Sequence, residues 1–258
     1  MADRVWRLLG VVVLLSGMLS GAAGAWAKIA HQRTVREHTY PERIGYLAVD
    51  GGSADVRIKA GAPDRVVVRT TVDWAVRMPV VDQTLADGAL KVTVRCSALL
   101  GVNVLGCGVQ LEIEVPADVS VGARVTSGSL QVRSLSGAVR VESTSGELKL
   151  DGVSGSVAAT TASGPVVAVN LGSALVQTQA ESGPVRISFI RPPQSVTVST
   201  SSGPVDITVP TGSHYRVTGR SDTDTRTVAP GLPDNNSTNG IDVTTTSGPV
   251  RIGTPSGR

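Results

Sequence analysis

The dipeptide Ser-Gly recurs every nine residues through the middle of the chain, and this spacing restricts the fold more than any other feature. It occurs at 127–128, 136–137, 145–146, 154–155 and 163–164. The residues two and four positions after each glycine are apolar, beginning with Leu130 and Val132, and the residue between them is mostly polar. Such alternation predicts short strands with one buried face. A helix is disfavoured, because each interior glycine would cost it about 1 kcal/mol.

The copies fall into two interleaved sets. One set carries its Ser-Gly corner at 126–128, 144–146, 162–164, 181–183 and 201–203, so that it recurs every 18 to 20 residues. We therefore predict an all-β chain that forms a single-handed β-solenoid, a flattened parallel β-helix-like stack of 18–20-residue turns, here called rungs, with two strands each. We expect glycine to supply a positive φ at the corners. A meander of antiparallel hairpins remains the alternative.

The repeats do not fill the whole domain. Regular copies cover 121–208 and 244–253, and residues 211–240 are rich in Pro, Gly, Asp and Asn, which indicates a loop or an irregular rung. Residues 44–115 contain looser alternating runs, and GGSADVRI at 51–58 resembles a decayed copy of SGPVRI. We expect this first half to begin the same sheets and to cap edges that would otherwise pair with other chains.

The N-terminus predicts the location of the protein. Arg4 and Arg7 precede an uncharged run from Leu8 to Ala27, which is about one bilayer crossing as a hydrophobic helix. Basic residues before the run favour a cytoplasmic tip and an extracytoplasmic domain, hence a single-pass protein of the cell membrane. Ala25-Trp26-Ala27 also fits a signal-peptide cleavage site, in which case the protein is secreted.

The resulting domain plan has three parts. We expect a cytoplasmic tip and transmembrane anchor, or a signal peptide, at 1–31, an exposed stalk at 32–43, and the β-solenoid at 44–258.

The two cysteines, Cys96 and Cys107, flank SALLGVNVLG between the alternating runs 89–95 and 109–115. An even pair across what reads as a hairpin, in an oxidising compartment, predicts a disulfide. Closing so short a loop would contribute about 3 kcal/mol in the chain-entropy model. A redox or metal pair would need C-x-x-C spacing or a nearby histidine, and neither is present.

Charge and motif content point away from several functions. With 24 basic and 21 acidic residues, the chain lacks the positive field that nucleic-acid binding requires. A calcium nonapeptide repeat needs paired glycines and a regular Asp, which these copies lack. The sequence therefore indicates no catalytic, cofactor-binding or metal-binding residues and a protein that is not an enzyme.

A few residues nevertheless have to be weighed as catalytic candidates. Glu142, Glu147 and Asp151 are the densest acidic group in the repeats, and they would have to converge to cleave a glycan. Asp206 takes the place that Arg186 and Arg251 take in sibling copies, which suggests ion pairing between rungs. The histidines, His31, His38 and His214, read as surface residues. Trp74 reads as a cap or core residue.

The chain also resembles a known family. Its N-terminal hydrophobic segment, VDGGSADV at 49–56, EVPADV at 114–119 and the following T-S-G-x-L/V-x-V copies are similar to the bacterial putative-adhesin family of envelope domains. The resemblance covers about residues 44–253 and implies a β-solenoid displayed outside the membrane. We expect a non-enzymatic, membrane-anchored module that contacts a cell-wall polymer or an envelope protein. A cell-envelope stress accessory is the alternative, and a wall-polysaccharide enzyme is a third.

Overall fold

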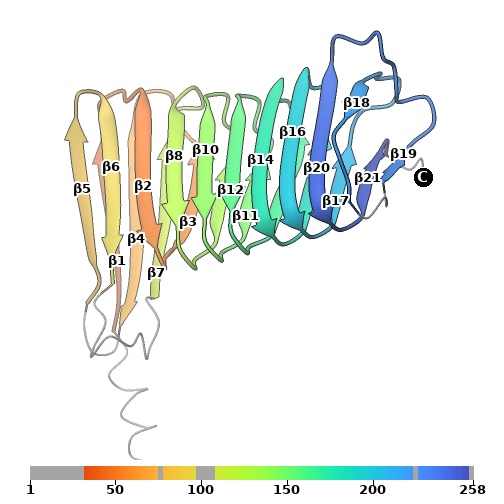
Figure 1. Cartoon of the computed structure of the whole chain (residues 1–258). Coiled ribbons are helices and arrows are strands. Elements are labelled where there is room, and N and C mark those ends of the chain that lie inside the picture. Colours follow the sequence, from red (N-terminus) through yellow and green to blue (C-terminus); the bar gives the residue numbers. More distant parts are fainter. Residues whose placement is uncertain (1–31, 75–77, 97–107, 223–225, 256–258) are drawn as a thin grey trace, which may run out of the picture.

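The computed structural model describes residues 32–74, 78–96, 108–222 and 226–255, and these residues fold into 21 strands in two sheets that lie face to face (Figure 1). Sheet A has the order β1 (Gln32–Tyr40), β4 (Val66–Trp74), β7 (Gly108–Val115), β3 (Asp55–Ala60), β9 (Leu130–Arg133), β11 (Leu148–Asp151), β13 (Val166–Leu171), β15 (Val185–Phe189), β17 (Val205–Thr208), β21 (Val250–Gly253) and β19 (Arg226–Val228). Sheet B has the order β18 (Arg216–Thr218), β20 (Gly240–Ser247), β16 (Ser195–Ser202), β14 (Leu175–Ser182), β12 (Val157–Thr161), β10 (Val139–Ser143), β8 (Ser120–Val125), β2 (Tyr46–Gly52), β6 (Ala89–Arg95) and β5 (Val80–Ala86). The predicted all-β class is confirmed. The expected N-terminal helix lies outside the described residues.

The two interleaved sets of copies are the two sheets. Val139 pairs with Val121 and with Val157 in sheet B, and Leu148 pairs with Leu130 and with Val166 in sheet A, always in parallel. Each rung therefore contributes one strand to each sheet and repeats the register of the rung before it. The antiparallel meander is excluded for the repeats. The expected decayed copy is also confirmed, because β3 pairs in parallel with β9.

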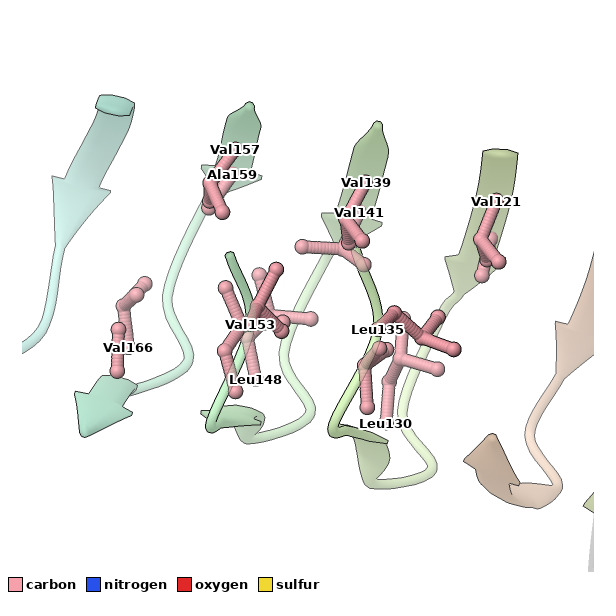
Figure 2. Close-up of a cluster of buried hydrophobic side chains, with 14 of the residues drawn as sticks. Val121, Leu130, Leu135, Val139, Val141, Leu148, Val153, Val157, Ala159 and Val166 are labelled. Atoms are coloured by element: carbon pink, nitrogen blue, oxygen red, sulfur yellow. The ribbon is translucent and has the colours of Figure 1, made fainter. Parts of the chain in front are cut away.

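The core is the narrow space between the sheets, and small branched side chains fill it. Figure 2 shows Val139 and Val141 from one sheet facing Leu130 and Leu148 from the other, all at most 2% exposed. Leu135 and Val153 close the core at the turns between strands. Such a thin core suits a chain with only 3% aromatic residues, because β-branched side chains pack closely on pleated sheets.

The corner glycines follow a different rule from the predicted one. In the early rungs their φ is not positive, and glycine is required because the rungs approach too closely for a side chain. A β-carbon on Gly146 would overlap the carbonyl oxygen of Gly128, and one on Gly164 would overlap that of Gly146. At later corners glycine is required both by the close approach of the rungs and by a positive φ. Gly203, for example, has a φ of 125° and leaves no room for a β-carbon beside Gly183. The expectation of positive φ was therefore wrong for the regular repeats and correct for the later Gly-Pro corners.

The N-terminal end departs from the rungs by closing with antiparallel strands. Strand β1 pairs antiparallel with β4, β4 with β7, and β5 with β6, where Asp87 and Gly88 form a tight turn with positive φ. This half therefore covers the first regular rung, through β2 beside β8 and β3 beside β9, and leaves β1 and β5 as the end strands of the two sheets.

This end also corrects two predictions. Residues 32–40 were expected in an exposed stalk, but they form strand β1 in sheet A. Their side chains are largely exposed, and backbone pairing with β4 holds them in the sheet. The runs around the cysteines do not form a hairpin. Strand β6 pairs with β2 in sheet B and β7 pairs with β3 in sheet A, so residues 96–107 join opposite sheets.

The C-terminal end is an irregular rung placed out of chain order. Strands β18 and β19, from the segment 211–240, pair outside β20 and β21, so the last Ser-Gly-Pro copy lies between this segment and the previous rung. Tyr215 and Leu232, two residues of this segment, are buried. The described residues of 211–240 therefore form a cap at the C-terminal end, with β18 beside β20 and β19 beside β21 (Figure 1).

Candidate functional site

The outer face of sheet B carries ladders of polar side chains, because parallel strands in register place equivalent outward residues side by side. One ladder runs through β8, β10, β12, β14, β16 and β20 as Arg124, Glu142, Thr160, Gln179, Ser199 and Thr244. A second runs beside it as Gly122, Arg140, Ala158, Gln177, Thr197 and Asp242. We call these two ladders, together with Tyr46 on β2, the polar strip.

The polar strip is hollowed by three adjoining depressions. The largest, about 550 Å³, follows the first ladder from Arg124 to Thr244, and a second of about 440 Å³ follows the other ladder from Tyr46 to Thr197. A third, of about 240 Å³, shares Glu142 with the first depression and Tyr46 with the second. The three therefore form a shallow path across the sheet, and the two larger ones are in the size range of small-molecule pockets.

Tyr46 is the aromatic residue of this strip. Its side chain is 44% exposed and lies across Gly122 on the neighbouring strand, where any β-carbon would overlap the phenol oxygen. Glycine at 122 thus leaves room for the ring on the outer face. An exposed ring held on one side offers its free surface for stacking. The sequence placed Tyr46 among aromatics that do not recur with the repeat, and only strand pairing brings it beside the ladders.

The three acidic candidates do not converge. Glu142 lies on the outer face of sheet B, where Arg124 Nη2 approaches its Oε2 at 2.7 Å. Asp151 lies on sheet A and accepts a hydrogen bond from Asn170 Nδ2 at 2.9 Å. Glu147 occupies the corner before β11 and lies 4.0 Å from Lys149. Carboxylates on opposite sheets cannot act together as acid and base on one glycosidic bond.

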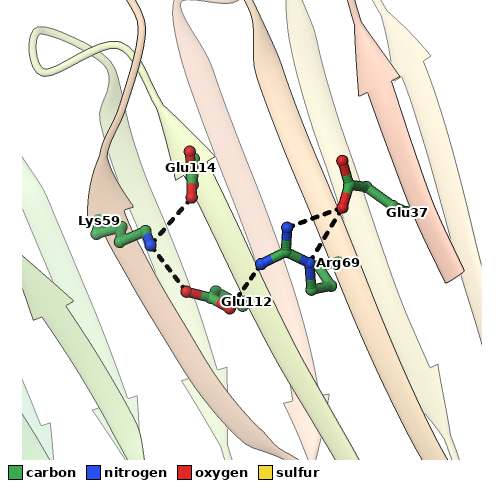
Figure 3. A network of polar contacts seen from close by, with 5 residues as sticks. All are labelled: Glu37, Lys59, Arg69, Glu112 and Glu114. Atoms are coloured by element: carbon green, nitrogen blue, oxygen red, sulfur yellow. Dashed lines mark hydrogen bonds and ion pairs between the residues drawn. The ribbon is translucent and has the colours of Figure 1, made fainter. Parts of the chain in front are cut away.

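A charged network covers the outer face of sheet A near the N-terminal end (Figure 3). Arg69 contacts Glu37 at 2.8 Å and Glu112 at 3.4 Å, while Lys59 contacts Glu112 at 2.9 Å and Glu114 at 3.0 Å. Hydrogen bonding to Glu112 and Glu114 raises the pKa of Lys59, and the bond from Lys59 lowers the pKa of Glu112. These ion pairs link β1, β4, β7 and β3, so we interpret the network as structural.

The remaining candidates are scattered. His38 lies on β1 against Tyr40, with ring centroids 4.5 Å apart, and His214 lies exposed in the C-terminal segment. Asp206 is flanked in register by Arg186 and Arg251, but its carboxylate forms no ion pair with either of these described residues. Trp74 ends β4. Among the described residues, no three His, Cys, Asp or Glu side chains gather closely enough to hold a metal ion.

Three predictions fall wholly or partly outside the described residues. His31, Cys107 and the segment 1–31 belong to these parts of the chain, so the bridge from Cys96 to Cys107 stays a prediction. Within the described ranges, no helix has the length and apolar character that a membrane span requires.

Sequence reasoning also missed a set of buried hydroxyls at the corners that follow sheet B. Ser143 Oγ donates to Gly146 O at 2.8 Å, and Thr161 Oγ1 accepts from Gly164 N at 3.0 Å. Thr200 and Thr245 repeat the position in register. The signal is the pattern [ST]-x-S-G, in which a hydroxyl residue precedes Ser-Gly by two positions.

A solenoid with polar outer faces and capped ends defines the class of the protein as a β-repeat module. The family model of Toastrack DUF4097 matches residues 117–253, more than half of the chain, and the chain belongs to this family. The resemblance to the putative-adhesin family of bacterial proteins is thereby confirmed. No curated protein matches the chain.

Several solved structures resemble this one at low identity. A putative adhesin from Bacteroides fragilis is 11% identical, with 86% of this chain and 97% of that chain covered and a TM-score of 0.42. A putative cell adhesion protein from Clostridium sporogenes is 10% identical, with 86% and 99% covered and a TM-score of 0.32. A putative lipid binding protein from Parabacteroides distasonis is 13% identical, with 86% and 96% covered and a TM-score of 0.35.

Proposed function

We propose that this protein is a non-enzymatic, membrane-anchored, extracytoplasmic module that binds an extended cell-wall polymer along the polar strip. The observation that carries the proposal is the continuity of the three depressions across the outer face of sheet B, with Tyr46 where two of them meet. A periodic surface of this kind fits a periodic ligand, since each rung places one outward residue of each ladder at a regular interval along the sheet.

The chemistry of the strip favours a hydroxyl-rich polymer over a protein. Thr160, Gln179, Ser199 and Thr244 offer neutral donors and acceptors, which suit hydroxyl and amide groups of a wall glycan. The exposed ring of Tyr46 adds a stacking surface. Stable protein interfaces instead have a core enriched in apolar and aromatic side chains. Beside the strip, the exposed aliphatic side chain of Leu175 lines one of the depressions.

Co-sedimentation of the full chain with isolated wall polysaccharide tests the proposal. Tyr46→Ala and the double variant Gln179→Ala/Ser199→Ala should lower the bound fraction several-fold. Arg186→Ala, an exposed change on the outer face of sheet A, should leave it unaltered. Equal binding by all variants, or sedimentation that requires an added envelope protein instead of the polymer, would refute binding along the strip.

Membrane anchoring rests on Arg4, Arg7 and the uncharged run that ends at Ala27. Cell fractionation followed by intact-mass measurement tests it. We expect a mass that begins at Met1 in the membrane fraction, two hydrogens lighter than the reduced chain because of the Cys96–Cys107 bridge. A soluble, secreted species that begins at Lys28 would overturn the anchor and make this a diffusible wall-binding protein.

A further inference from the structure

We propose that the cavity between β1 and β5, at the N-terminal end of the solenoid, binds a small amphiphilic carboxylate. This end pocket of about 570 Å³ is lined by Arg36, Tyr40, Thr70, Val72, Met78 and Val81, among others. It lies at the end of the molecule away from the C-terminal cap and uses no residue of the polar strip, so it is a site in addition to the proposed wall-binding surface.

The pocket forms because the two sheets end in strands that are not covered by another rung within the described residues. The inner face of β1 looks toward β5 across the continuation of the core. Tyr40 Oη donates to Gln83 Oε1 at 2.8 Å and so ties the last strand of sheet A to the last strand of sheet B. Burial raises the pKa of Tyr40, which keeps this donor protonated. The walls are therefore held together while the space between them stays open.

The inner wall of the pocket is apolar. Val72 is 3% exposed, and Met78 and Val81 pack against the end of the hydrophobic core. A ligand that enters this space must bring an apolar part, because burying apolar surface is the main favourable term for such a site.

Two polar groups on adjacent strands give the pocket its preference for a negative head group. Arg36 faces Thr70 in the register of β1 and β4. Thr70 is 4% exposed, and its Oγ1 has no hydrogen-bond partner. A buried hydroxyl without a partner is uncommon in native proteins and indicates that a partner is supplied from outside. Arg36 is exposed and forms no ion pair with another described residue, and its planar guanidinium matches a carboxylate.

His38 and Glu37 also line the pocket, and neither reverses this preference. The carboxylate of Glu37 is bound by Arg69 on the outer face of sheet A. His38 contacts Tyr40 edge-on and adds aromatic surface to the lining. The unpaired positive charge beside an apolar wall thus selects an anion with a short hydrocarbon chain.

Octanoate is the probe for the test, with octylammonium as the probe of the same chain length and opposite charge. The full chain carries three methionines, Met1, Met18 and Met78, so ¹³C-methyl-methionine NMR gives a local signal from the pocket. Met78→Leu identifies that signal. We expect octanoate to shift the Met78 methyl resonance in a saturable way and octylammonium to leave it unchanged.

Three variants separate the site from general surface binding. Arg36→Gln should weaken octanoate binding about tenfold, because a charged hydrogen bond is lost. Thr70→Val should weaken it several-fold without lowering the melting temperature, because the hydroxyl it removes has no partner in the free protein. Arg33→Gln, on the opposite face of the same strand, should bind as the parent chain does. No shift of Met78, equal binding of octylammonium, or equal loss in Arg33→Gln would overturn the proposal.

Discussion

Gly146 packs directly on the backbone carbonyl oxygen of Gly128, the equivalent residue one rung earlier, and leaves no room for a β-carbon. Gly164 repeats the contact on Gly146. Glycine therefore recurs every nine residues because successive rungs approach too closely at both corners for a side chain to fit.

Gly146→Ala should therefore destabilise the protein by about 1–3 kcal/mol, because overpacking forces the neighbouring backbone to move. Urea unfolding of the variant and the parent chain measures the difference. Gly45→Ala is the matched control, since Gly45 is exposed and no atom lies within 4 Å of the place that an alanine β-carbon would take there. If the two variants are equally stable, close approach of the rungs is not the reason for glycine.

Thr161→Val should destabilise by about 1–3 kcal/mol, because the buried amide of Gly164 would lose its acceptor. Thr161→Ser should recover most of the loss, since it keeps the oxygen. Thr160→Val, the exposed neighbour, should change stability by less than about 0.5 kcal/mol. Chemical denaturation measures the unfolding free energy of the three variants. If Thr161→Val is as stable as the parent chain, the corner hydroxyl is not needed for stability.

The free energy of unfolding should fall less between neutral and acid pH in Glu112→Gln than in the parent chain. The pKa of Glu112 is lowered in the folded protein from its ordinary 4.5, so its contribution is present above that value and is lost as the pH falls through the folded pKa. The group lies near the surface, which limits the effect to about 1 kcal/mol or less.

The measurement for this prediction is unfolding free energy against pH from neutral pH to about 3, the range below an ordinary glutamate pKa. The variant should be less stable than the parent chain at neutral pH and equal to it at the acid end. Glu181→Gln, at an exposed position without an ion pair to another described residue, should follow the parent profile. A constant gap between Glu112→Gln and the parent at every pH would contradict the ion-pair explanation.

Tyr215→Ala should destabilise by about 3–5 kcal/mol, because the ring, which belongs to the C-terminal segment, is fully buried and its loss leaves a cavity. Hydrogen exchange should accelerate first in β18 and β20, which pair beside it. Tyr46→Ala, where the ring is half exposed, should leave the melting temperature nearly unchanged, so its wall-binding defect can be read as a contact effect. Uniform exchange along the solenoid in Tyr215→Ala would show that the segment is not a separate cap.

The sequence alone was sufficient to predict the regular part of the fold, because the information there is local and repeated. The apolar and polar alternation within each copy predicts which residues are buried. The constant interval between copies makes parallel stacking the simplest arrangement. Leu130, Leu148 and Val166 could be aligned by counting, and they are neighbours in sheet A. The same alternation puts Glu142 at an outward position of its strand, and there it pairs with Arg124 on the outer face of sheet B.

The ends and the candidate sites were decided by tertiary structure, because strand pairing there joins segments that share no repeat. Residues 32–40 read as a polar stalk, yet backbone hydrogen bonds to β4 make them a strand. The runs beside the cysteines have the alternation of a hairpin, and only the parallel partners β2 and β3 place them in opposite sheets. Tyr46 meets Gly122, and Arg36 meets Thr70, for the same reason. Periodicity determines which face of a strand is buried, whereas the neighbour of each strand at an irregular end depends on the packing of the whole chain.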